Sequence, residues 1–137
     1  MDRMIRCITS DGSLMAAAVD TTNIVAIAQE LHHTSAVGTA ALGRMLSAAS
    51  IMGAMLKQEN ASVTMKINGG GPLGSVVAIA DSRGNVRGYV EHPEVELPLK
   101  PNGKLDVGGG GGRDGLLMVI RDFGEGEPYV GQVRIAT

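Results

Sequence analysis

Apolar and polar residues alternate at the start of the chain and then recur with the spacing of a helix. Residues 3–8 and 14–19 alternate in part and flank the pair Asp11-Gly12, which suits a tight turn, so a β-hairpin is expected here. Residues 20–23 all carry side chains that accept hydrogen bonds from the free amides of a helix start. Apolar residues then follow at helical spacing: Ile24, Ile27 and Leu31. The pattern predicts a short helix that ends near His32-His33.

The longest helix is expected over residues 36–57, after the capping residues Thr34 and Ser35. Its bulky apolar positions lie between small ones, namely Gly38, Ala41, Gly43, Ala49 and Gly53. Small residues let another backbone approach closely, which predicts that this helix is the buried centre of the domain. Arg44 lies in its middle, where a charge inside a bilayer costs about 2.5 to 3.5 kcal/mol, so a membrane span is rejected.

After Asn60 the apolar period changes from 3.6 to 2, which is typical of strands. Residues 63–67, 75–80 and 86–91 predict a three-stranded meander, and residues 116–121 and 129–135 predict a last hairpin. Between them, His92–Gly115 holds three prolines and five consecutive glycines, a composition that predicts a long loop.

Together these elements predict an α+β fold in a single domain of residues 1–137. A largely antiparallel sheet of hairpins and a meander is expected to pack on the long central helix and a shorter helix. In particular, the helix of residues 36–57 should lie across the strands 63–67, 75–80 and 86–90.

Charge and cysteine content exclude several classes of function. Lys and Arg number 12 against 14 Asp and Glu, a balance that argues against nucleic acid as a partner. The single cysteine, Cys7, cannot form a disulfide within the chain, and no signal segment opens the sequence, so the protein is expected in the cytoplasm. Cys7 itself lies among apolar neighbours in the first strand, where we expect a small inert hydrophobe.

Two glycine-rich segments, residues 69–74 and 110–115, match the G-x-G-x-x-G pattern of a phosphate-binding loop. Such a loop must open a helix, and each of these segments precedes a predicted strand. We therefore expect the glycines to permit tight crossings between strands. A small-molecule or nucleotide-binding enzyme domain that uses one of these loops remains the alternative.

Neither a metal site nor a catalytic site is indicated by the residue spacing. His32, His33, His92 and Cys7 lack the spacing of metal ligands, and no nucleophile motif of the G-x-S-x-G type is present. We expect no cofactor, no metal and no enzymatic activity in this chain.

Five segments together resemble the amino-terminal core domain of the redox-regulated 33 kDa chaperonin family of bacteria. They are residues 2–6, 33–36, 69–74, 84–90 and 128–133. The resemblance implies a cytosolic, ATP-independent holdase of the heat-shock and oxidative-stress response, which binds unfolded client proteins and prevents their aggregation.

Members of that family carry carboxy-terminal C-x-C and C-x-x-C motifs that hold zinc when reduced. This chain holds only Cys7, so we expect a truncated core domain without the zinc-binding redox switch. Apolar surface that the rest of the family's core would cover should then be exposed, which predicts association at least to a homodimer.

The expected client-binding residues are Met45, Met52, Met55 and Leu56 of the long helix. Unbranched, polarisable methionines can repack around unrelated apolar segments, as a holdase requires. The alternative is that methionines at helical spacing are ordinary core residues.

Overall fold

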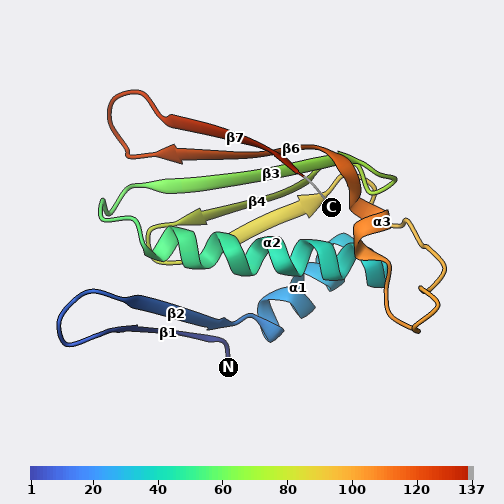
Figure 1. Ribbon diagram of the computed structural model, residues 1–137, viewed down its shortest axis with the longest axis horizontal. Coiled ribbons are helices and arrows are strands. Elements are labelled where there is room, and N and C mark those ends of the chain that lie inside the picture. The colour runs from blue at the N-terminus through green and yellow to red at the C-terminus, as the bar shows by residue number, and fades with distance from the viewer. Residues whose placement is uncertain (136–137) are drawn as a thin grey trace.

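Within residues 1–135, which the computed structural model describes, the chain folds into a two-stranded sheet, a five-stranded sheet and three helices (Figure 1). In chain order the elements are β1 (Arg3–Ile8), β2 (Met15–Asp20), α1 (Thr22–His32), α2 (Ala36–Ala54), β3 (Ser62–Gly70), β4 (Val76–Asp81), β5 (Val86–Val90), α3 (Val107–Gly111), β6 (Gly112–Asp122) and β7 (Tyr129–Ile135). The α+β class, both hairpins, the meander and the two main helices are confirmed.

The large sheet is antiparallel throughout and has the strand order β5-β4-β3-β6-β7. Strands β3, β4 and β5 form the meander, and β6 and β7 form the last hairpin. The two units join where β6 pairs with β3, with Met65 opposite Val119. This pairing joins strands far apart in the chain, and the alternation within each strand does not specify it.

Helix α2 lies between the large sheet and the amino-terminal hairpin (Figure 1). Its buried face, which includes Leu42, Leu46 and Ala49, packs with Val63 and Ala78 in the core. The helix contacts β4 most extensively, then β5 and β3, so the predicted packing of the long helix across the meander is confirmed.

Small residues allow this close packing. A Cβ added at Gly53 would lie only 2.8 Å from the Cβ of Ala80 and would overlap the Asp81 carbonyl. The helix ends at Ala54, three residues earlier than the pattern predicts. There the Ala54 carbonyl accepts a hydrogen bond of 2.9 Å from the guanidinium of Arg6, a partner in β1.

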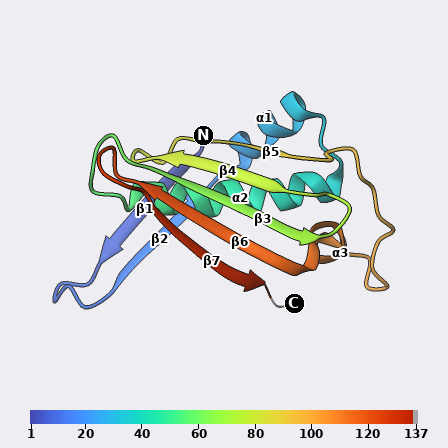
Figure 2. The same ribbon diagram turned by 90° about the horizontal axis from the view of Figure 1, so that it is seen from above.

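The prediction of one long loop over His92–Gly115 is wrong for the glycine run. Residues 107–111 form the short helix α3, and β6 begins at Gly112 (Figure 2). The side chain of Asp106 caps α3 by accepting a hydrogen bond of 2.9 Å from the Gly109 amide. The Gly110 carbonyl in turn accepts from the Leu73 amide at 2.9 Å. These bonds to a distant segment compensate for the poor helix propensity of glycine.

Helix α1 begins near the expected position and is capped in part as predicted. Asp20 accepts a hydrogen bond of 3.0 Å from the Thr22 amide, but the Thr21 side chain makes no capping hydrogen bond, and the amides of Asn23 and Ile24 donate to Asp2. At the other end His33 adopts a left-handed conformation with φ of 52°, which turns the chain from α1 into α2.

Candidate functional site

The four residues expected to bind clients do not form one exposed surface. Met45, Met52 and Leu56 are half-buried and pack against the core of α2 and the sheet. Met55 is 41% exposed, at the end of the helix. Met45 and Met52 lie seven residues apart in α2 and so share one face of the helix, whereas Met55 is its carboxy-terminal cap and Leu56 follows the end of the helix. Their role in client binding stays a prediction.

An apolar groove of about 560 Å³ lies between α1 and β5. Its lining includes three large apolar side chains that stay well exposed: Ile27, Leu31 and Tyr89 are 57%, 70% and 49% exposed. From the sheet, Val77 and Ile79 complete the apolar floor. The site therefore offers contact area for apolar side chains of another molecule.

The sequence pattern does not single out this groove. Ile27 and Leu31 recur at helical spacing with Ile24, a period that equally fits a core-facing stripe. In the structure α1 carries no fully buried residue. Only the position of α1 beside β5 shows that these side chains line open space.

A second exposed apolar surface covers the β1–β2 hairpin. Ile5, Ile8, Leu14 and Met15 are all more than half exposed. Cys7 lies in β1 as predicted but is an exposed free thiol, and its expected behaviour as a small inert hydrophobe stays a prediction. The exposure arises because this two-stranded ribbon is separate from the large sheet, which leaves most of its side chains uncovered.

The two glycine-rich segments lie against one another, as expected for a tight crossing of strands. A Cβ added at Gly69 would lie 2.6 Å from the Gly111 carbonyl oxygen. Backbone amides that a phosphate would need are already in use, because Gly71 donates to the Gly111 carbonyl at 3.2 Å and Gly74 donates to the Gly71 carbonyl at 3.1 Å. The geometry favours a structural role for these glycines.

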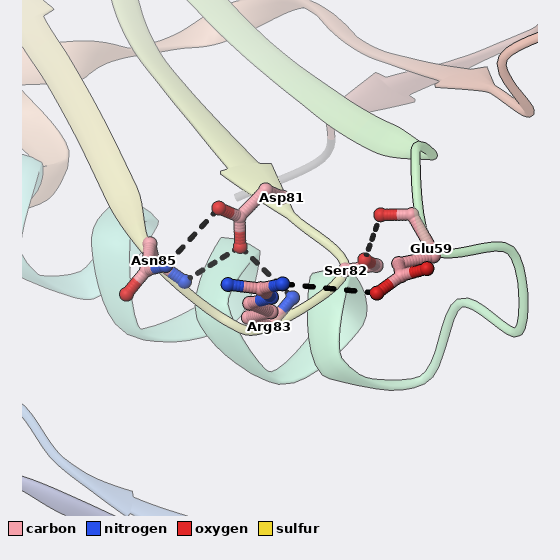
Figure 3. Close-up of polar contacts among 5 residues, drawn as sticks. All are labelled: Glu59, Asp81, Ser82, Arg83 and Asn85. Carbon is pink, nitrogen blue, oxygen red and sulfur yellow. Dashed lines mark hydrogen bonds and ion pairs between the residues drawn. The ribbon is translucent and has the colours of Figure 1, made fainter.

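The β4–β5 turn holds a polar cluster whose bonds are local (Figure 3). The carboxylate of Asp81 accepts from the amides of Arg83 and Asn85 at 2.9 and 3.0 Å, and from the Asn85 side chain at 3.1 Å. Burial raises the pKa of Asp81, but these hydrogen bonds and the nearby Arg83 charge outweigh it, so the pKa lies below its usual value. Arg83 and Ser82 also contact Glu59, which ties the turn to the loop after α2. The cluster keeps the carboxylate ionised and shapes the turn.

The described residues do not fit a metal ion. Among residues 1–135, no three His, Cys, Asp or Glu side chains gather where they could hold one. Over the same residues, no helix has the length and apolar character needed to cross a membrane.

Comparison with known proteins gives the same family along the whole chain. The model of the Hsp33 protein family matches residues 2–137. The 33 kDa chaperonin of Alkaliphilus metalliredigens is 51% identical over 129 residues, which cover 94% of this chain and 44% of the relative. The 33 kDa chaperonin of Clostridium tetani is 47% identical over 134 residues, which cover 98% of this chain and 46% of that relative. The chain thus spans a little under half the length of these curated relatives.

A solved structure shows the same fold. The crystal structure of the 33 kDa chaperonin from Thermotoga maritima superposes with a TM-score of 0.89 at 39% identity, and the match covers 96% of this chain and 45% of that one. The matched family is named for a heat-shock protein and the relatives are named chaperonins, which are not a known class of enzyme. The chain belongs to the Hsp33 protein family.

Proposed function

We propose that this chain is the client-binding core of a holdase, which captures unfolding proteins without ATP and keeps them from aggregating. The observation that carries the proposal is the open apolar groove between α1 and β5, in a member of a chaperone family. A holdase must bind many sequences, and apolar contact is suited to this because it is not directional.

Exposed apolar side chains can supply the free energy that binding of a client requires. Fully burying one large apolar side chain contributes about 1.5–3 kcal/mol. The groove and the β1–β2 hairpin each offer several side chains of this kind, namely Ile27, Leu31 and Tyr89 in the first and Ile5, Ile8, Leu14 and Met15 in the second. Contacts of this size support reversible capture of a client, since part of the gain is offset by the entropy cost of association.

The family resemblance implies redox regulation through zinc-binding C-x-C and C-x-x-C motifs, and residues 1–137 contain neither motif. Cys7 is the only cysteine of the 137 residues and is a free thiol. We therefore propose that client binding by residues 1–137 is insensitive to thiol oxidants. The exposed free thiol also suits the reducing cytoplasm, which we propose as the location.

Light scattering of a thermally aggregating client, citrate synthase, tests the holdase function. The expected result is that the chain, added without ATP, lowers the scattering in proportion to its concentration, and that neither ATP nor hydrogen peroxide changes the effect. Serum albumin at the same concentration controls for non-specific protection. Scattering that matches the albumin control would contradict the holdase function.

We also propose that the chain self-associates, at least to a homodimer. Strand β7 is at an edge of the large sheet, and Tyr129, Val130 and Val133 in it are each more than half exposed. Edge strands with exposed apolar residues pair readily with a second chain. Sedimentation equilibrium at micromolar concentration tests this, and a pure monomer would count against it.

A further inference from the structure

Strand β5 has one free edge, and its free backbone groups can be assigned. It is an outer strand of the large sheet and pairs only with β4. The Glu91 amide donates to the Ser75 carbonyl, and the Asp81 amide donates to the Asn85 carbonyl. Because hydrogen-bonded and non-bonded pairs alternate in an antiparallel ladder, Arg87 and Tyr89 also bond to β4.

The amides and carbonyls of Val86, Gly88 and Val90 therefore point away from β4, but Val90 is only 4% exposed, so Val86 and Gly88 are the residues whose free groups lie open along the groove. Within residues 1–135 no loop or side-chain hydrogen bond reaches them. The free groups recur every second residue, about 6.8 Å apart. An extended chain presents donors and acceptors with the same spacing, whereas a helix uses its own internally.

The apolar groove lies along this same edge. Val86 and Gly88 line it from the face of β5 that packs on α2, and Tyr89 and Arg87 line it from the other face. A space bounded by both faces of a strand extends around its edge. Ile27 and Leu31 form the opposite wall, on α1, so a chain placed beside β5 would direct every second side chain toward them.

The charges of the groove restrict its occupant further. Among the described residues that line it, Arg87 and His32 are the basic ones, and no carboxylate is present. Such a lining disfavours segments rich in Lys or Arg, because like charges would be brought together as water is excluded.

We propose that the free edge of β5 binds an extended apolar segment of an unfolded client as an added β-strand, with alternate side chains against α1. The inference rests on the proposed holdase function and gives it a site. The backbone ladder supplies affinity for any sequence, and the groove selects uncharged apolar side chains. This arrangement accounts for binding of many clients by one rigid surface.

Amide hydrogen exchange followed by NMR tests the added strand. The probe is a ten-residue peptide of Val, Thr and Ser with capped ends. On peptide binding, exchange should slow at the amides of Val86 and Gly88 and stay unchanged at Arg87 and Tyr89, which already bond to β4. The same peptide with all its amides N-methylated should not bind, because it cannot donate to the edge.

Side-chain variants test the groove. The double variant Ile27→Gln and Leu31→Gln should bind the peptide at least about tenfold more weakly, while Leu99→Gln should bind as the wild type does. Leu99 is the matched control, because it is 59% exposed and lies outside the groove lining. All three replaced side chains are exposed, so the folds should stay intact, which the NMR spectra check directly.

The results separate the site from the function. If the chain suppresses aggregation but the amides of Val86 and Gly88 keep their exchange rates, or the double variant binds normally, the β5 site is overturned and the holdase function stands. If the chain neither suppresses aggregation nor binds the peptide, both are overturned. If the amides of Val86 and Gly88 are protected without peptide, and more so at higher protein concentration, the edge binds a second copy and the client site is wrong.

Discussion

Asp2 caps helix α1 from a distance of 22 residues in the chain: its Oδ2 accepts a hydrogen bond of 2.7 Å from the amide of Ile24. The Oδ1 atom accepts a second bond of 2.9 Å, from the Asn23 amide. The first turn of α1 carries no acidic residue of its own. Asp2 therefore adds two acceptor atoms and a negative charge to a helix start whose Thr22 amide already donates to Asp20, and it connects the amino terminus to α1, one wall of the groove.

Replacing Asp2 should loosen this connection. Asp2→Ala is expected to lower the free energy of unfolding by about 1 kcal/mol, because two helix-start amides lose their acceptors. Asp2→Asn, which keeps one acceptor oxygen, should lose less. Urea denaturation measures both, and equal stability of Asp2→Ala and the wild type would disprove the cap.

Gly53 should tolerate no side chain. Gly53→Ala places a Cβ 2.8 Å from the Cβ of Ala80 and against the backbone of Asp81, so α2 must move away from the sheet. The expected cost is about 1–3 kcal/mol of unfolding free energy. Gly111→Ala is the matched control, because a Cβ there meets nothing within 4 Å. The idea fails if the two variants unfold at the same urea concentration.

The turn of the β1–β2 hairpin should respond to acid. The amide of Ser13 and the hydroxyls of Thr9 and Ser13 donate to Asp11, and they lower its pKa from 3.8 to about 2. Because the pKa is lower in the folded state, the contribution of Asp11 to stability is present above pH 3.8 and is lost as the pH falls toward about 2.

Asp11→Ala should therefore be less stable than the wild type at neutral pH, and the difference should narrow as the pH falls through that range. NMR titration of the Asp11 carboxyl carbon checks the pKa itself. Thr9→Val should move the midpoint back toward 3.8. A wild-type midpoint at 3.8 would contradict the assigned hydrogen bonds.

Met52 and Met55 should separate core packing from client binding. Met52 is half-buried against the core, so Met52→Gln should cost about 1–3 kcal/mol, the cost of burying an unpaired amide. Met55 is 41% exposed, and Met55→Gln should change stability by no more than about 0.5 kcal/mol.

If the methionines of α2 bind clients, Met55→Gln should keep its circular dichroism spectrum and suppress client aggregation less well. Loss of the fold in Met52→Gln alone would assign that residue to the core. Should both variants keep their fold and full activity, α2 is not the binding surface.

Much of the fold could be predicted from the sequence, because the signals that specify it are local. The spacing of Ile24 and Leu31 indicates α1, and the alternation over residues 63–67 indicates the centre of β3. The small residues of the long helix predict its close contact with the sheet, as Gly53 shows. The family resemblance is also read from local signals, because it rests on five short segments in a fixed order, and the family model confirms it.

The tertiary structure alone decided which of these residues are covered. Gly108–Gly112 disfavours regular structure when considered alone, but Asp106 and Leu73 hold it in a helical turn and the start of β6. Cys7, Ile27 and Leu31 belong to elements predicted correctly, yet all three are exposed. Periodicity fixes the direction of a side chain relative to its own backbone, whereas exposure depends on which distant segment packs against that side. For Ile27 and Leu31 the packing of α1 beside β5 decides the exposure, and for Cys7 the separation of the β1–β2 ribbon from the large sheet decides it, and no local pattern contains either arrangement.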